Sequence, residues 1–238
     1  FIANWKMYGG LNSLKSLIFF VIFLKKFKKK KLIKIIYCPP NTLIHALSKK
    51  LKLTSIDVGG QNCHPNIDYG AFTGSVNSMM LKDVGARYVI IGHSENRQNG
   101  ENDRLINSKI KSAIKSNLKI IFCIGESLVE KRKKKTNLVL TKQIKIGLNK
   151  IKNKNKIIIA YEPVWAIGTG KTPNSKELSK TINFIKNKLR NNKVLYGGSV
   201  NSKNINELKL TNNIDGFLIG GASHNPKKFI DIIKKTYN

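Results

Sequence analysis

The strongest constraint on the fold of this chain is a set of short apolar runs that recur along its whole length. Each run ends at Gly, Pro or a polar cluster, and the runs cover residues 1–5, 35–38, 56–59, 88–91, 120–124, 157–160, 194–196 and 217–219. Within a run, apolar residues are mostly continuous and do not alternate with polar ones. Such continuity is typical of strands that are buried on both faces. The sequence therefore predicts a parallel sheet covered by helices.

Lys-rich segments with helical spacing separate these runs. Residues 105–114 and 178–189 show apolar residues three or four positions apart, and residues 128–156 fit one or two helices with a basic face. Strands that alternate with helices indicate β/α units. At 238 residues, the chain has the length at which eight such units close into one barrel. We therefore expect an α/β protein with a single (β/α)8-barrel domain over residues 1–238.

The charge of the chain is strongly unbalanced. Lys and Arg number 44 against 13 Asp and Glu, which gives a formal net charge of +31 at pH 7. This excess raises nucleic acid, acidic membranes and anionic substrates as partners. The lysines are spread over the whole chain, however, and no aromatic stacking platform is interleaved with them. We therefore expect no specific nucleic-acid partner, and a lysine-rich surface composition accounts for the excess.

Cysteine usage and the apolar run 18–24 bear on the compartment. Cys38, Cys63 and Cys123 are odd in number and widely spaced, which favours neither a disulfide framework nor a zinc site. The run 18–24 is too short to span a bilayer, which takes about 20 apolar residues. We interpret it as a buried amphipathic helix. The chain is expected to be cytoplasmic, without a membrane partner or a metal.

The residues that carry chemistry cluster where the predicted strands end, which is the end at which barrels of this type place their active sites. Five motifs stand out: residues 4–7 (NWKM), 70–74 (GAFTG), 91–95 (IGHSE), 160–170 (AYEPVWAIGTG) and 196–200 (YGGSV). Their order and spacing resemble the triosephosphate isomerase family from the first residues almost to the last. The resemblance implies a TIM barrel that interconverts dihydroxyacetone phosphate and D-glyceraldehyde 3-phosphate through an enediol(ate), without a cofactor.

By this resemblance, Glu162 is the base that moves the proton between two carbons. His93 and Lys6 stabilise the negative charge on the substrate oxygen, Asn4 assists, and Glu95 is a supporting carboxylate. The sequence itself adds two physical arguments. Desolvation under a closing lid strengthens a carboxylate base. A His just before a helix start has its charged form disfavoured by the field of the helix N-terminus, so it can donate a hydrogen bond while neutral.

The resemblance also implies a phosphate site and a dimer. Asn4 and Lys6 contact the substrate, and Gly168, Ser199, Gly220 and Gly221 match the phosphate-binding positions. Backbone N–H groups beside glycines are suited to this task. The connection between Gln61 and Ser78 is long for a loop of its class. In the family it crosses a twofold axis, with the counterpart of Thr73 against the partner, so we expect a homodimer.

The sequence departs from the family pattern at three places. Asn96 stands where Arg is usual, Ser75 stands where an acidic residue is common, and residues 17–24 are unusually apolar for the first barrel helix. The first departure puts subunit packing in question, and none of the three touches the inferred catalytic groups.

Two other kinds of function and one other motif fit the sequence less well than the isomerase. A nucleic-acid-binding module predicts binding that weakens steeply with salt, and a degenerate barrel serving as an interaction protein is disfavoured by the intact motifs. Residues 170–172 (GKT) resemble the end of a Walker loop, but the first glycine of that loop would fall at Trp165.

Overall fold

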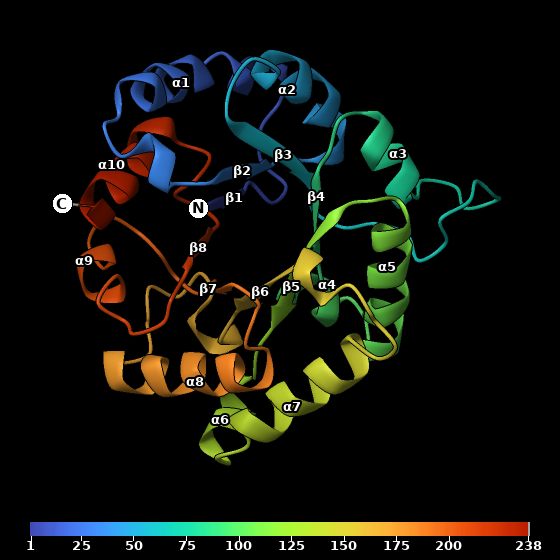
Figure 1. The fold of residues 1–238 in the computed structure, drawn as a ribbon, viewed down its shortest axis with the longest axis vertical. Coiled ribbons are helices and arrows are strands. Elements are labelled where there is room, and N and C mark those ends of the chain that lie inside the picture. Colours follow the sequence, from blue (N-terminus) through green and yellow to red (C-terminus); the bar gives the residue numbers. More distant parts are fainter. Residues whose placement is uncertain (238) are drawn as a thin grey trace.

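The strands of the protein pair in parallel, in chain order, and close into a barrel (Figure 1). The structure, a computed structural model, describes residues 1–237. The strands are β1 (Ile2–Asn4), β2 (Ile35–Cys38), β3 (Ile56–Gly60), β4 (Tyr88–Ile91), β5 (Lys119–Ile124), β6 (Ile157–Tyr161), β7 (Val194–Tyr196) and β8 (Gly216–Ile219). The ring closes where Ile2 of β1 pairs with Leu218 of β8. The predicted (β/α)8 TIM barrel is confirmed, and each strand matches its predicted run to within one residue at either end.

Both faces of the strands are buried. In β2, Ile36 and Cys38 belong to an apolar cluster that draws on strands all around the ring and fills the barrel. Ile35 and Tyr37 belong to the larger cluster between the strands and the helices. Successive side chains of a strand point to opposite faces. Two buried faces therefore favour an apolar residue at nearly every position, which is why the runs are mostly continuous.

Helices surround the barrel (Figure 1). They are α1 (Leu17–Lys26), α2 (Ile44–Leu51), α3 (Ser78–Asp83), α4 (Ser94–Gln98), α5 (Asp103–Lys115), α6 (Leu128–Arg132), α7 (Thr136–Gly147), α8 (Ser175–Lys188), α9 (Ile205–Leu208) and α10 (Pro226–Tyr237). The segment 128–156, for which one or two helices were predicted, contains α6, α7 and a final 3-10 turn at Lys154–Lys156.

Helix α1 differs in part from its prediction as a buried amphipathic helix. Leu17, Phe20 and Leu24 are buried against the barrel, as expected. Ile18, Phe19 and Ile22 are exposed on the outside. An apolar run of this length covers more than one face of a helix, because residues a turn apart share a face and those between them do not.

The connection from β3 to α3 extends away from the barrel at the right of Figure 1. It contains residues 61–77, and most side chains from Asp68 to Ser75 are exposed. Two further sequence expectations concern cysteines and membranes. Cys38, Cys63 and Cys123 are buried and free. Across residues 1–237, the helices are all too short or too polar to cross a bilayer.

Candidate active site

The predicted catalytic residues lie at the carboxyl ends of the strands, on one face of the barrel. Asn4 ends β1, His93 follows β4 and begins α4, and Glu162 directly follows β6. A cavity of about 650 Å³ opens at the opposite face, where it is lined by the first residues of β4, β5, β6 and β8. Barrels of this type place their chemistry at the carboxyl face. We therefore assign the site to the cluster around Glu162.

Glu162 is a buried carboxylate with one oxygen left free. Its side chain is 2% exposed. The Ser94 N–H donates to Oε2 at 3.2 Å. Oε1 has no hydrogen-bond partner among the described residues and lies 3.4 Å from Nε2 of His93. A buried carboxylate oxygen without a donor is an unsatisfied acceptor, so it is available to a group that enters the site.

His93 is held in one ring orientation by the helix that it begins. The Glu95 N–H donates to Nδ1 at 3.3 Å. Glu95 Oε2 is 3.6 Å from the same nitrogen, which is too long for a hydrogen bond. A nitrogen that accepts an N–H carries no proton itself, so we assign the neutral tautomer with its proton on Nε2. That proton lies on the side of Glu162.

Lys6 occupies an unusual backbone conformation, with φ at +53°. Residues with a Cβ rarely adopt this region, and such strained backbone recurs at functional sites. Two side chains stabilise the conformation: the Lys6 N–H donates to Asn4 Oδ1 at 3.1 Å, and Gln61 Nε2 donates to the Lys6 carbonyl at 2.8 Å. Lys6 Nζ forms an ion pair with Glu95 at 2.8 Å. The ammonium is thus directed along the mouth of the barrel.

Two small residues make room for Glu162. A Cβ on Gly197 would lie 2.8 Å from Glu162 Cγ, so only glycine fits beside the carboxylate stem. Cys123 packs on the inner side of the barrel, and burial raises the pKa of its thiol well above the ordinary value, with the nearby Glu162 carboxylate as a smaller cause. The thiol therefore stays neutral and acts as packing beside the carboxylate.

The predicted phosphate-binding residues fall into two groups. In the first, the Ser199 hydroxyl donates to the Ala166 carbonyl at 2.6 Å and accepts the Gly170 N–H at 3.2 Å. These bonds join the segment after β7 to the segment that follows Glu162. Gly168 lies between, with φ at +70°, a conformation that favours glycine.

The second group lies beside β1. A Cβ on Gly220 would be 3.3 Å from Lys6 Cε, and a Cβ on Gly221 would meet nothing within 4 Å. The Ser223 N–H donates to the Gly220 carbonyl at 2.8 Å. The turn therefore brings glycine backbone next to the ammonium of Lys6. Such a pairing of backbone and cation suits an anionic group.

The segment after Glu162 is anchored at its start by a second buried carboxylate, Glu126. Trp165 Nε1 donates to Glu126 Oε1 at 3.0 Å, and the Tyr161 hydroxyl donates to the same oxygen at 3.1 Å. Burial raises the pKa of Glu126 above its ordinary value, and the hydrogen bond from Trp165 is the largest opposing cause. Glu126 thus holds Trp165 in place against the barrel wall.

Replacing Trp165 with Phe should destabilise the protein by about 1–3 kcal/mol at neutral pH, because buried Glu126 loses a donor to its ionised form. The loss raises the pKa of Glu126 further. A carboxyl pKa that is raised in the folded state lowers the free energy of unfolding at pH values above that pKa. The cost disappears at low pH, where the group is protonated in both the folded and the unfolded state. The penalty should therefore shrink as the pH falls through the raised pKa, which urea unfolding at neutral and mildly acidic pH measures.

Trp5 offers the matched control, because its Nε1 is buried without a hydrogen-bond partner among the described residues. Any loss of stability in Trp5→Phe should not depend on the ionisation of Glu126, so it should be the same at neutral and at mildly acidic pH. Equal pH dependence in the two variants would contradict the assigned role of the Trp165 hydrogen bond.

The remaining residues singled out from the sequence lie apart from this cluster. Thr73 is exposed in the 61–77 connection. Asn96 is in α4, and the next residue, Arg97, donates to the carbonyls of Gly92 and Cys123 and pairs with Asp103 at 2.7 Å. Arg97 therefore ties the ends of β4 and β5 to α5.

Sequence reasoning gave no role to three residues of the site. Gln61, Cys123 and Glu126 each contact a predicted group or its anchor. Gln61 and Glu126 are polar residues just beyond a strand end, and that signal was available in the sequence. The position of Cys123 depends on the side of the barrel that it faces, which one strand alone does not reveal.

Known proteins resemble the chain over nearly all of its length. A family model described as triosephosphate isomerase matches residues 1–236. Proteins named triosephosphate isomerase from Dictyoglomus thermophilum and Thermodesulfovibrio yellowstonii are 43% and 41% identical, and each alignment covers 98% of this chain and 97% of the relative. A crystal structure of triosephosphate isomerase from Bartonella henselae is similar with a TM-score of 0.90 at 35% identity, covering 100% of this chain and 98% of that chain.

Proposed function

Because this chain belongs to the triosephosphate isomerase family, we propose that Glu162, His93 and Lys6 carry its reaction. The protein is an isomerase that interconverts dihydroxyacetone phosphate and D-glyceraldehyde 3-phosphate, a step of glycolysis and gluconeogenesis. Within that reaction, we propose which side chains of this chain move the proton, which stabilise the negative charge on the substrate oxygen, and which backbone N–H groups hold the phosphate.

Glu162 removes a proton from the carbon next to the carbonyl and returns it to the neighbouring carbon. His93 donates its Nε2 proton toward the oxygen on which negative charge develops, and the ammonium of Lys6 stabilises the same charge. Asn4 keeps Lys6 in position by accepting its N–H. Glu95 supports both partners, since it pairs with Lys6 Nζ and its N–H orients His93. The route requires neither a metal nor a cofactor.

One observation carries the proposal: the free oxygen of Glu162 lies 3.4 Å from Nε2 of His93, and both side chains are buried. Acid and base thus face one small space that excludes most water. A substrate carbon and the oxygen beside it can contact a carboxylate and an imidazole at the same time only if the two groups point into the same space. The phosphate is proposed to bind the N–H groups around Gly168, Ser199, Gly220 and Gly221.

Turnover in deuterium oxide tests the single-base route. Glyceraldehyde 3-phosphate supplied to the purified protein should yield dihydroxyacetone phosphate that carries solvent deuterium at the carbon that gained the proton, because a carboxyl proton exchanges with water. Mass spectrometry of the product measures this. A Glu162→Gln protein that incorporates deuterium into the product at the wild-type rate would remove Glu162 from its role.

We also propose that the protein is a homodimer in which the 61–77 connection contacts the partner. This connection is exposed and projects from the barrel (Figure 1), and it carries Tyr69 and Phe72 with 69% and 44% of their surface exposed. Large exposed apolar side chains on a projecting loop favour a protein contact. Met7 and Tyr8, which follow Lys6, are also exposed and offer a complementary apolar surface.

Sedimentation at micromolar concentration should give the mass of two chains. Thr73→Arg should shift the population toward monomer, because a bulky charge enters the contact, and should lower activity on dilution. Asn187→Arg, at an exposed position on α8, adds the same charge elsewhere and should leave both unchanged. Full activity in a protein that sediments as one chain would contradict the dimer.

We also propose the domain organisation and the cellular location of the protein. Strands from the start to the end of the chain build one barrel, which supports residues 1–238 as a single catalytic domain. Asn238 lies outside the described residues. The three free cysteines and the metabolic role support a cytoplasmic location.

A further inference from the structure

Helix α1 presents apolar side chains to solvent as well as to the barrel. Ile18, Phe19 and Ile22 are 46%, 59% and 45% exposed. The spacing of these residues places them on one stripe, since positions three and four apart are neighbours on a helix. The opposite face is buried against the barrel and against α10. A helix that is apolar on both sides indicates that its outer side also meets an apolar medium.

Lysines extend this stripe at both ends. Lys15 lies three and four positions before Ile18 and Phe19, and Lys25 and Lys26 lie three and four positions after Ile22. All of them are exposed, as are the lysines that follow the helix. We call the whole set the α1 surface: Ile18, Phe19, Ile22, Lys15, Lys25, Lys26, Lys28, Lys29, Lys30 and Lys31.

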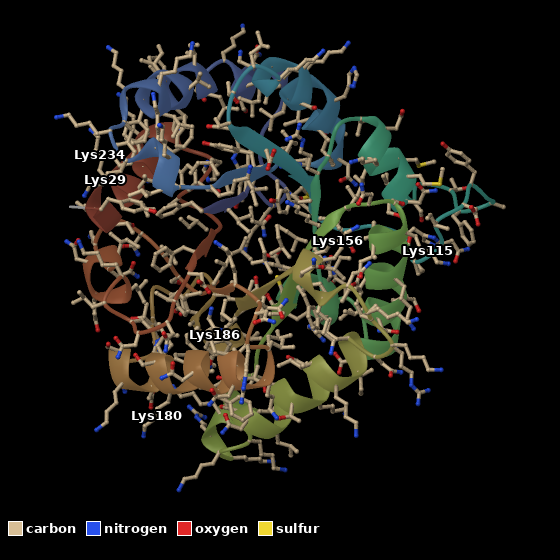
Figure 2. The ribbon with its side chains drawn as sticks, in the orientation of Figure 1. Lys29, Lys115, Lys156, Lys180, Lys186 and Lys234 are labelled. Carbon is tan, nitrogen blue, oxygen red and sulfur yellow. The ribbon has the colours of Figure 1, made fainter. Side chains whose placement is uncertain are left out.

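The α1 surface carries no compensating acid nearby in sequence. The first acidic residue of the chain is Asp57, so the segment before it contains lysines alone among the charged residues that ionise at neutral pH. The adjacent α10 adds Lys234, whose Nζ lies 5.8 Å from the Phe23 ring. Figure 2 shows Lys29 and Lys234 close together beside α10, and Lys29 also lies over the Tyr237 ring. The positive field is therefore concentrated beside the apolar stripe.

Charge and position together decide which occupant fits. A second copy of this chain would bring another lysine cluster against the first, and like charges in contact cost several kcal/mol. The connection proposed for the dimer lies beside α3, on another side of the ring from α1 (Figure 1). A nucleic acid would satisfy the lysines but leave the exposed stripe in water.

We propose that the α1 surface docks onto anionic phospholipid membranes, with Ile18, Phe19 and Ile22 in the headgroup layer and the lysines against the lipid phosphates. An interfacial helix of this kind combines an apolar side that enters the boundary between headgroups and acyl chains with basic residues that bind anionic lipid. The ten residues of α1 measure about 15 Å, so the helix lies on the bilayer and does not span it.

Docking in this way is compatible with catalysis. Helix α1 lies on the outside of the barrel, whereas Glu162 and His93 lie at the carboxyl ends of the strands (Figure 1). Contact through the outer face of α1 leaves the mouth of the barrel open to solvent. The bound enzyme should therefore turn over triose phosphates at the same kcat as the free enzyme.

Vesicle co-sedimentation tests the proposal. The full chain should bind vesicles of phosphatidylcholine with about 30% phosphatidylglycerol, and about 0.5 M salt should weaken this binding. Pure phosphatidylcholine should bind at least tenfold less. Phe19→Ser combined with Ile22→Ser should lower binding to the anionic vesicles at least fivefold, and Gln at positions 28–31 should lower it at least tenfold. Both variants should keep the wild-type kcat, which shows that they are folded.

A matched variant separates the α1 surface from the overall charge. Gln at Lys176, Lys180, Lys188 and Arg190 also removes four positive charges, but from the region of α8, where Lys180 is labelled in Figure 2. This variant should lose less than twofold. An equal loss in both charge variants, or full binding after removal of Phe19 and Ile22, would overturn the proposal. The proposal would also be overturned if the protein bound polyglutamate and not the vesicles, and if the substitutions in the α1 surface weakened that binding. The partner would then be an acidic protein.

Discussion

Replacing Glu162 with Gln should lower kcat on glyceraldehyde 3-phosphate by about three orders of magnitude, in line with the contribution of a positioned general base. The amide has nearly the same shape, so the 3.2 Å bond from the Ser94 N–H can persist with the amide oxygen as acceptor. What is lost is the lone pair with the basicity of a carboxylate, on the oxygen that lies 3.4 Å from His93 Nε2. Substrate binding should change far less, because the proposed phosphate contacts lie at Gly168, Ser199, Gly220 and Gly221.

The measurement is a coupled steady-state assay of kcat and KM, together with urea unfolding. Glu207→Gln is the control, because it removes a carboxylate of the same type from an exposed position on α9. It should retain wild-type kcat. A Glu162→Gln protein that unfolds at the wild-type urea concentration and turns over at the wild-type rate would show that another group is the base.

Substituting Gly125 with Ala should destabilise the protein by about 3 kcal/mol and lower kcat about 100-fold. A Cβ at this position would lie 1.8 Å from the carbonyl oxygen of Glu162 and 2.5 Å from its carbonyl carbon. Both atoms belong to the backbone, so no side-chain rotation relieves the overlap. The end of β6 must shift, and the carboxylate of Glu162, the proposed base, shifts with it.

The surroundings of Gly125 leave little freedom for such a shift. The Gly125 N–H donates to Gln143 Oε1 at 2.9 Å, and Gln143 Nε2 donates to the Gly125 carbonyl at 3.0 Å. The Glu162 N–H donates to the carbonyl of Ile124 at 2.8 Å. Gly10→Ala is the control, because a Cβ there would meet nothing within 4 Å. Urea unfolding and kcat measure both variants. Normal kcat in Gly125→Ala would show that the position of Glu162 tolerates displacement.

The strands and their order were predictable because burial on both faces leaves a direct mark in the sequence. Ile35 and Ile36 face opposite sides, yet both must be apolar, so the run is unbroken. The candidate chemical residues were singled out for a related reason, since most of them stand at or shortly after the end of such a run. Chain order then determines which strand ends are neighbours.

The parts that sequence did not predict depend on side-chain direction. The orientation of Glu162 follows from two features of distant segments. The Ser94 N–H at the start of α4 donates to the carboxylate, and Gly197 leaves space beside the carboxylate stem. The φ of Lys6 depends on Gln61, which lies just after the third strand. Likewise, the apolar run at α1 gave no sign of how many of its residues would lack cover.

Closure of the ring between β1 and β8 has a consequence for biosynthesis. The pairing of Ile2 with Leu218 joins the first and the last strand of the barrel, so it cannot form until β8 has left the ribosome. Before that moment, β1 has one open edge, and side chains such as Ile36 lack their final neighbours across the barrel. Long-range pairings of this kind form late and leave sticky surfaces exposed meanwhile. The nascent protein is therefore vulnerable to aggregation until β8 has been made, which is the period in which chaperones would protect it best.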